Sequence, residues 1–185
     1  MLLINGSHRE KNCFNILNDI KNENDVLLSL SNKNIKFCVG CNQCKNKLEK
    51  LCIIDDFITN EIYSKIIENN KIVLASPLYI SNISGMLKTL IDRLNPFYNH
   101  NLLEGKHIYL ILTGQGSYDD NFEEIMMIIK YFEGISEWLG FKFHFLKYFS
   151  SGDLNEIDDI KKENINYSEM INDIINNLNR IEERD

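Results

Sequence analysis

The stretch from residue 71 to residue 93 constrains the fold of this chain more than any other. It opens with an uninterrupted apolar run, residues 72–75, which is typical of a strand buried on both faces of a parallel sheet. Ser76 and Pro77 follow, and because proline has no N–H to donate to a neighbouring strand, the pair predicts the end of this strand. Apolar residues then recur every three or four positions over residues 83–94, which predicts a helix with one buried stripe. A ligand-binding loop is expected between the two, since ligands in open α/β sheets bind at the carboxyl ends of strands.

The same alternation of strand and helix recurs along the whole chain. Strands are predicted at residues 1–5, 26–30, 72–75, 107–112 and 141–149. Helices are predicted at residues 13–21, 57–67, 83–94, 122–139 and, near the C-terminal end, about 166–183. Residues 95–106 are predicted to be a polar connection. This order predicts an α/β fold with a doubly wound, five-stranded parallel sheet, helices on both faces, and a single domain over residues 1–185.

Composition and charge narrow the classes of function. The 185 residues are 44% hydrophobic, which is enough for a substantial core. The net charge of −7 provides no electrostatic footprint for nucleic acid or for an anionic membrane. No apolar run is long enough to span a bilayer, and a first strand that begins almost at Met1 leaves no room for a secretory signal, so we expect a cytoplasmic protein. In a reducing compartment, five cysteines indicate thiol or metal chemistry rather than disulfides.

A polar loop rich in Gly, Ser and Asn follows the first predicted strand. It covers residues 6–12 and leads directly into a predicted helix, whose first-turn N–H groups can bind an anion. Arg9 can add a bidentate contact to phosphate oxygens. The loop is therefore a candidate phosphate site, and the alternative is an ordinary tight turn with a surface arginine.

Four cysteines lie close together in the sequence, at Cys38, Cys41, Cys44 and Cys52. The Cys-x2-Cys-x2-Cys spacing places three thiolates on one loop, and a cysteine farther along can complete the ligand set of a [4Fe–4S] cluster. Zinc accepts the same four sulfurs in a tetrahedron. Free, partly buried thiols are the third alternative, and the residues alone leave all three open.

Three motifs occur in a fixed order in the first half of the chain. They are Asn5-Gly6-Ser7-His8-Arg9 with Asn12-Cys13, the cysteine run that ends in Asp55-Asp56, and Ser76-Pro77-Leu78-Tyr79 through Leu87-Lys88 to Ile91-Asp92-Arg93. In these motifs the chain resembles the flavodoxin-like NAD(P)H-dependent FMN reductase family and, within it, the iron–sulfur flavoprotein group. It departs from the family at His8, where proline is usual, and at Lys11-Asn12-Cys13, where the family has a glycine before an Asn-Thr or Asn-Ser pair.

The resemblance implies strand order 2-1-3-4-5, with FMN at the carboxyl ends of strands 1, 3 and 4. It assigns the FMN phosphate to the first loop, the ribityl chain and isoalloxazine ring to the loop after the third strand, and the other edge of the ring to the loop after the fourth. The implied FMN-binding residues are Ser7, Arg9, Asn12, Cys13, Pro77, Leu78, Tyr79, Ile80, Asn82, Thr113, Gly114, Gln115 and Gly116. The thiol of Cys13 is a weaker phosphate partner than the hydroxyl that the family usually has there.

The implied activity is that of an FMN-dependent oxidoreductase. NADH or NADPH would be the hydride donor, and a small molecule or a redox protein would accept the electrons. The flavin carries the chemistry, so no side chain is assigned a catalytic role, and Asp92-Arg93 is interpreted as a structural ion pair on the helix surface. Two alternatives are an electron-transfer or redox-sensing flavoprotein without nicotinamide turnover, and a flavin-free domain with a structural zinc–cysteine site. By analogy with relatives, a homodimer or homotetramer is expected.

Overall fold

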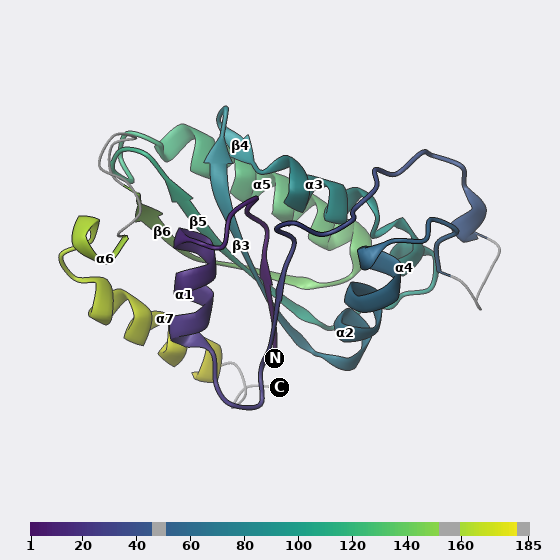
Figure 1. Cartoon of the computed structure of the whole chain (residues 1–185), viewed down its shortest axis with the longest axis horizontal. Helices are drawn as coiled ribbons and strands as arrows, with labels where there is room; N and C mark the ends of the chain where they lie inside the picture. The colour runs from purple at the N-terminus through teal and green to yellow at the C-terminus, as the bar shows by residue number, and fades with distance from the viewer. Residues whose placement is uncertain (46–50, 152–159, 181–185) are drawn as a thin grey trace.

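A five-stranded parallel sheet forms the centre of the molecule in the computed structural model, which describes residues 1–45, 51–151 and 160–180 (Figure 1). The parallel strands are β1 (Leu2–Asn5), β2 (Val26–Ser29), β3 (Lys71–Tyr79), β5 (His107–Gly114) and β6 (Lys142–Ser150). Their order is β2-β1-β3-β5-β6, so the predicted order 2-1-3-4-5 is confirmed for the parallel strands. A short strand that was not predicted, β4 (Asn82–Ile83), pairs antiparallel with the end of β3.

Helices cover both faces of the sheet, as predicted. They are α1 (Asn12–Ile20), η1 (Gln43–Lys45), η2 (Ile58–Ile62), α2 (Tyr63–Glu68), α3 (Gly85–Asp92), α4 (Asn95–Asn99), α5 (Phe122–Leu139), α6 (Ile160–Glu163) and α7 (Tyr167–Arg180). In Figure 1, α1, α6 and α7 lie on one side of the sheet, whereas α2, α3, α4 and α5 lie on the other. The polar connection predicted at residues 95–106 instead contains α4, because Phe97 is fully buried in the core. The last helix ends within the described residues at Arg180, and the predicted extension over residues 181–183 lies outside them.

Alternate side chains of each central strand enter different cores. Ile72 and Leu74 pack with the helices α2, α3 and α5, whereas Val73 and Ala75 pack with α1, α6 and α7. All eight residues of β5 are buried. This double burial explains why the central strands are uninterrupted apolar runs rather than alternating ones.

Pro77 does not end the third strand, so that prediction is wrong. β3 continues to Tyr79, and Pro77 pairs with Thr113 of β5. The Gly6 N–H donates to the Ala75 carbonyl at 2.8 Å, which shows that Ala75 faces β1. Pro77, two residues on, has its nitrogen on the same side, where β1 has already ended at Asn5. The missing proline N–H therefore leaves no neighbour without a partner.

β6 lies at the edge of the sheet, as its alternating pattern predicts. Leu110 pairs with Phe145 and Ile111 with Lys147, so one extra residue of β6 forms a bulge between them. Among the helices of the described residues, none is both long enough and apolar enough to cross a membrane. That residues 1–185 form a single domain stays a prediction.

Candidate functional site

The loop after β1 and the carboxyl ends of β3 and β5 meet at one pocket of about 140 Å³. Ten of the predicted FMN-binding residues line it: Ser7, Arg9, Asn12, Cys13, Pro77, Leu78, Tyr79, Thr113, Gly114 and Gln115. Lys11 and Ser151 line it as well and were not predicted. Ile80, Asn82 and Gly116 do not line it. The carboxyl ends of neighbouring parallel strands meet at one edge of the sheet, which explains how segments a hundred residues apart share this pocket.

A buried amide at the end of β1 sets the shape of the first loop. Asn5 donates through Nδ2 to the Ser29 hydroxyl at 2.9 Å and to the Arg9 carbonyl at 3.2 Å, and its Oδ1 accepts from the Ser7 N–H at 3.1 Å. The Ser31 hydroxyl donates to the His8 carbonyl at 2.8 Å. The partners of Asn5 are known only from the fold, although a fully buried Asn at the end of an apolar strand requires such partners.

Gly6 allows the first loop to pack directly against the start of α3. A Cβ atom at this position would lie 2.9 Å from the Ala75 carbonyl oxygen and 2.9 Å from Leu87 Cβ. The Ser84 hydroxyl donates to the Gly6 carbonyl and accepts from the Leu87 N–H, so it caps α3. The first loop and α3 are held together by these contacts.

The start of α1 supplies an anion-binding group to the pocket. No side chain caps this nine-residue helix at Lys11, so its first-turn N–H groups and partial positive charge face outward. Arg9 is exposed and lines the same pocket. Asn12 Oδ1 is buried without a hydrogen-bond partner among the described residues. A ligand that combines a phosphate with hydroxyl groups, as FMN does, fits this set of donors and this unpaired acceptor.

Cys13 connects the start of α1 with the end of β5. Its side chain is 2% exposed, and its Sγ lies 3.4 Å from Thr113 Oγ1. Burial raises the pKa of the Cys13 thiol to about 12, although the Thr113 hydroxyl and the Arg9 guanidinium act in the opposite direction. The thiol is therefore neutral at pH 7 and lies between the first turn of α1 and the end of β5.

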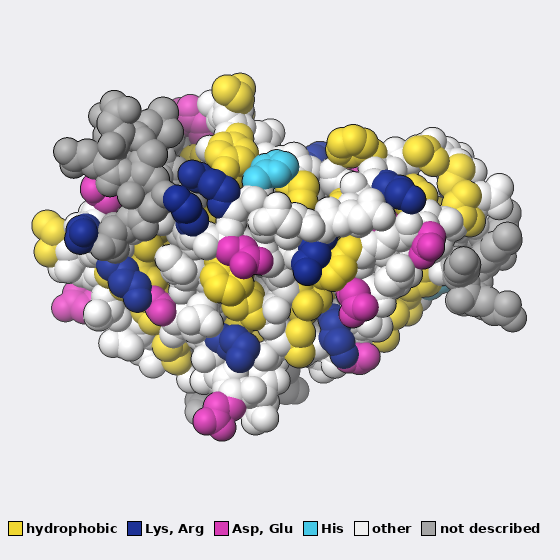
Figure 2. Space-filling view, in the orientation of Figure 1, with side chains coloured by type: hydrophobic (Ala, Val, Ile, Leu, Met, Phe, Trp, Pro, Cys, Tyr) yellow, Lys and Arg dark blue, Asp and Glu magenta, His cyan; other side chains and the backbone are white. Residues whose placement is uncertain are grey.

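The β3–β4 hairpin forms a wall beside the pocket. Leu78 pairs with Ile83 and Tyr79 with Asn82, which leaves Ile80 and Ser81 as a two-residue turn. Both turn residues have positive φ, 48° and 58°, and a β-branched residue such as Ile80 is strained there. The Tyr79 ring lies 6.5 Å from the His8 ring of the first loop. In Figure 2, apolar, basic and histidine side chains lie side by side over this part of the molecule.

Tyr148 of β6 fixes the loop that follows β5 by hydrogen bonds. Its hydroxyl donates to the carbonyls of Gln115 at 3.0 Å and Gly116 at 3.1 Å, and it accepts from Asn121 Nδ2 at 3.1 Å. Burial, and then the Asp120 carboxylate, raise the pKa of Tyr148 to about 12, so the phenol keeps its proton at neutral pH. A Cβ at Gly114 would lie 2.9 Å from the Tyr148 hydroxyl oxygen. No sequence motif pointed to Tyr148 or Asn121.

The four predicted metal ligands line a different pocket, of about 40 Å³. They belong to the cysteine segment, which we define as residues 37–55, of which 46–50 lie outside the described residues. Cys38 and Cys41 are exposed, and Cys44 and Cys52 are partly buried. Within the described part of the chain, no three or more Cys, His, Asp or Glu side chains are grouped to hold a metal ion. The thiol chemistry fits a thiolate-ligated metal or cluster, whereas the ligand geometry is not preformed.

The pair Asp92-Arg93 is not a surface ion pair, so that interpretation is wrong. Asp92 is exposed and pairs with Lys88. Arg93 is 1% exposed and pairs instead with Asp56, at 2.9 Å between Nη1 and Oδ2 and 3.2 Å between Nη2 and Oδ1. No local sequence pattern indicates this pair, because Asp56 and Arg93 come from segments that meet only in the folded chain.

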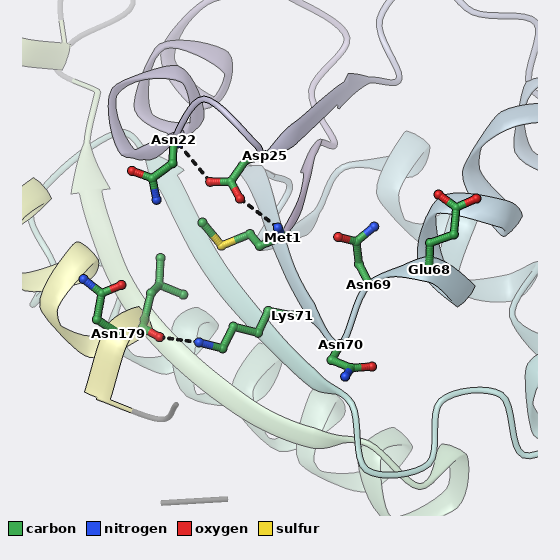
Figure 3. A pocket seen from close by; sticks show the side chains of 9 residues that line it. Met1, Asn22, Asp25, Glu68, Asn69, Asn70, Lys71 and Asn179 are labelled. Carbon is green, nitrogen blue, oxygen red and sulfur yellow. Dashed lines mark hydrogen bonds and ion pairs between the residues drawn. The ribbon is translucent and has the colours of Figure 1, made fainter. Parts of the chain in front are cut away.

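A larger pocket, of about 380 Å³, lies at the opposite end of the strands (Figure 3). Its charged groups already have partners: the Met1 amino group pairs with Asp25 Oδ1 at 2.7 Å, and Lys71 Nζ donates to the Leu178 carbonyl at 2.8 Å. None of the predicted site residues lines it. The pocket at the carboxyl ends of the strands is therefore the better candidate for a cofactor site.

The first two-thirds of the chain match a known family model. Residues 1–122 match the model described as NADPH-dependent FMN reductase. An iron-sulfur flavoprotein from Methanocaldococcus jannaschii is 44% identical over 69 residues, which are 37% of this chain and 34% of that protein. An iron-sulfur flavoprotein from Archaeoglobus fulgidus is 36% identical over 78 residues, which are 42% of this chain and 34% of that protein. The matched part thus spans about a third of the length of these relatives.

Solved structures share the fold over nearly the whole chain. An FMN-dependent NADH-azoreductase from Bacillus anthracis, in complex with FMN, has a TM-score of 0.61 at 13% identity and covers 97% of this chain and 98% of its own. The Trp repressor binding protein from Bacillus subtilis has a TM-score of 0.59 at 18% identity and covers 94% of this chain and 96% of its own. At these identities the likeness concerns the fold alone, and it confirms the predicted flavodoxin-like class.

Proposed function

Since the chain belongs to the NADPH-dependent FMN reductase family, we propose that it is an FMN-dependent oxidoreductase. NADH or NADPH would donate the hydride, and a small molecule or a redox protein would accept the electrons. The observation that carries this proposal is the pocket where the loop after β1 and the carboxyl ends of β3 and β5 converge. FMN supplies hydride and single-electron chemistry when it is bound.

Each loop contributes a different kind of contact. The N-terminus of α1 and the Arg9 guanidinium would bind the phosphate, and Asn5 holds the loop in shape for it. Asn12 Oδ1, buried and unpaired among the described residues, would accept from a ligand hydroxyl. Leu78 and Tyr79 offer apolar surface to a planar ring. These contacts bind and orient, and no side chain is assigned an acid, base or nucleophile role.

The cysteine segment would hold a [4Fe–4S] cluster through Cys38, Cys41, Cys44 and Cys52. Two observations support this: the four cysteines line one pocket, and the relatives from Methanocaldococcus jannaschii and Archaeoglobus fulgidus are named iron-sulfur flavoproteins. A structural zinc ion would use the same thiolates. With a cluster, electrons could enter or leave one at a time, which suits a redox-protein acceptor.

The proposal is tested on protein prepared without oxygen and supplied with iron, sulfide and FMN. We expect both flavin and iron–sulfur absorption in the visible spectrum, and oxidation of NADH or NADPH in the steady state. Flavin binding without nicotinamide oxidation would instead identify an electron carrier or redox sensor. Zinc without flavin would contradict the proposal as a whole.

Arg9 provides the residue test of the flavin site. Arg9→Ala should weaken FMN binding about ten- to a hundredfold, the loss expected for one charge-assisted hydrogen bond to phosphate. FMN titration followed by flavin fluorescence measures this change. Lys21→Ala, which removes a cation at the far end of α1, is the matched control and should bind FMN as the unaltered protein does. Equal affinity in the two variants would remove Arg9 from the site.

A further inference from the structure

The cysteine segment is closed at its base by hydrogen bonds between its two flanks. Lys36 lies just before the segment and Asp56 just after it. The Lys36 N–H donates to Asp56 Oδ2 at 2.9 Å. The next residue, Phe57, donates its N–H to the Asn34 carbonyl at 3.0 Å. The two flanks of the segment therefore meet at one point, beside α3 and α4 (Figure 1).

Arg93, directly after α3, occupies this point. Besides its two bonds to Asp56, its Nη1 donates to the Lys36 carbonyl at 2.9 Å, so one guanidinium binds both flanks of the segment. Its backbone carbonyl accepts from the Tyr63 hydroxyl at 2.5 Å. The position of the guanidinium is thus determined from several sides.

The Nε–H group of this guanidinium has no hydrogen-bond acceptor among the described residues. Arg93 Nε is buried and has no hydrogen-bond partner among the described residues, although the side chain is only 1% exposed. Arg93 also lines the pocket that contains the four cysteines. A buried donor without a partner is costly, and here it lies beside a pocket of sulfur atoms.

The other polar neighbours of this pocket are also mostly donors. Asn95 Nδ2 lies 3.5 Å and Asn99 Nδ2 3.9 Å from Cys44 Sγ, within hydrogen-bonding range for sulfur. Among the described residues of the lining, the one carboxylate is Asp92, and it is paired with Lys88. The Arg93 charge is balanced by Asp56, but its Nε–H and the two amide groups remain directed to this region as donors, and donors around sulfur atoms favour an anionic group ligated by thiolates.

We propose that Arg93 is a positioning residue for the cluster at the four cysteines, that its Nε–H donates to a sulfur atom of the bound cluster, and that its charge raises the cluster's reduction potential. This inference rests on the proposed cluster. Hydrogen bonds to the sulfurs and nearby charge are two of the factors that set the potential of an iron–sulfur site. A buried charge acts more strongly than an exposed one, because water does not screen it.

The first test observes the Nε–H of Arg93 in the otherwise unaltered protein. The chain has four arginines, so a sample labelled with ¹⁵N-arginine gives few Nε–H signals, and Arg93→Lys identifies the one from Arg93. Loading with iron and sulfide should shift this signal and slow its exchange with solvent about tenfold or more, as a hydrogen bond to a charged acceptor does. An unchanged signal in a protein whose spectrum shows the cluster would overturn the inference and leave the proposed function intact.

The second test measures the reduction potential of the cluster in FMN-loaded variants. Arg93→Gln should favour the oxidised state at least about tenfold, a shift of about 59 mV for a one-electron couple. Lys130→Gln removes an exposed positive charge from α5, outside the lining of the cysteine pocket, and should leave the potential unchanged. An equal potential in both variants would contradict the role of the Arg93 charge.

Two further outcomes have defined meanings. If Arg93→Gln does not fold, the response of the Arg93 Nε–H signal to cluster loading in the unaltered protein decides whether the inference holds. If the unaltered protein binds FMN but no cluster after anaerobic supply of iron and sulfide, the cluster is removed from the proposed function and this inference falls with it, while the flavin site stands.

Discussion

At the scale of single residues, the Asp56 carboxylate shows how a buried charge is made tolerable. Both of its oxygens accept hydrogen bonds from the Arg93 guanidinium, and the N–H groups of Lys36, Ile58 and Thr59 donate to it as well. Burial alone would raise the pKa of Asp56, but the bonds from Arg93, Lys36 and Thr59 outweigh it and hold this pKa below its usual 3.8. The pair stabilises the fold only while the carboxylate is ionised.

This pair predicts a dependence of stability on pH. Because the pKa of Asp56 is lower in the folded than in the unfolded chain, its contribution is fully present above pH 3.8 and is lost as the pH falls through the folded value. Asp56→Asn should lower the free energy of unfolding by about 3–5 kcal/mol at pH 7, since it leaves a buried guanidinium without its counter-charge. Urea unfolding between pH 7 and pH 3 should show a weaker dependence on pH in the variant.

Asp92→Asn is the control for this measurement. Asp92 lies next to Arg93 in the chain, and this variant breaks only the exposed pair of Asp92 with Lys88. The free energy of unfolding should therefore change by less than about 1 kcal/mol. If the two variants lost the same free energy of unfolding, burial of the Asp56–Arg93 pair would not explain its contribution to stability.

At the scale of elements, α3 connects the two candidate sites. Its N-terminal cap, Ser84, is bonded through its hydroxyl to the Gly6 carbonyl in the first loop and through its N–H to the Ser76 hydroxyl within β3. At the other end, Arg93 binds both flanks of the cysteine segment. The helix has eight residues and is therefore about 12 Å long. One short, rigid element thus positions parts of both sites.

Gly6 offers a test of the contact between the first loop and α3. Gly6→Ala should push the loop away from Ala75 and Leu87, because its Cβ would lie within 2.9 Å of both. We expect a loss of about 1–3 kcal/mol in the free energy of unfolding and weaker FMN binding, as for an overpacked contact. Urea unfolding and FMN titration measure the two effects.

Gly85, the first residue of α3, is the matched control. A Cβ at this glycine meets nothing within 4 Å. Gly85→Ala should therefore leave FMN affinity unchanged and keep or slightly increase stability, since alanine favours a helix more than glycine does. Similar losses in both variants would argue against a specific contact at Gly6.

At the scale of the whole molecule, the two sites draw on different parts of the chain. The proposed flavin pocket uses the loop after β1 and the carboxyl ends of β3 and β5, whereas the cysteine pocket uses the cysteine segment and the residues from Asp92 to Pro96. Among the described residues, none lines both pockets. The two proposed cofactors should therefore be separable by mutation.

Cys41→Ser tests this separation. A cluster needs all four thiolates, so the variant should lose iron and acid-labile sulfide together and keep FMN at its normal affinity. Gln43→Ser, in the same part of the cysteine segment, should keep both. Metal analysis, sulfide analysis and FMN titration on anaerobic samples provide the measurements. Loss of FMN with the cluster would mean that the sites are not independent.

The sequence by itself determined the order of elements, the two-sided burial of the sheet and the family. These are local properties: an uninterrupted apolar run such as residues 72–75, or a stripe such as that of α5, records which faces are buried wherever the partner comes from. Ten of the thirteen predicted flavin residues share one pocket because strand order alone brings their loops together. Their role in binding FMN stays a prediction.

Only the tertiary structure decided what depends on partners far apart in the chain. Pro77 continues β3 because β1 has already ended beside it. Arg93 can be buried because its guanidinium donates to the Asp56 carboxylate and the Lys36 carbonyl. Ile80 turns away from the pocket because β4 folds back on β3 as a hairpin. In each case a residue far away in the sequence makes a conformation or a buried charge energetically favourable. A local sequence pattern does not include that residue and therefore could not predict the outcome.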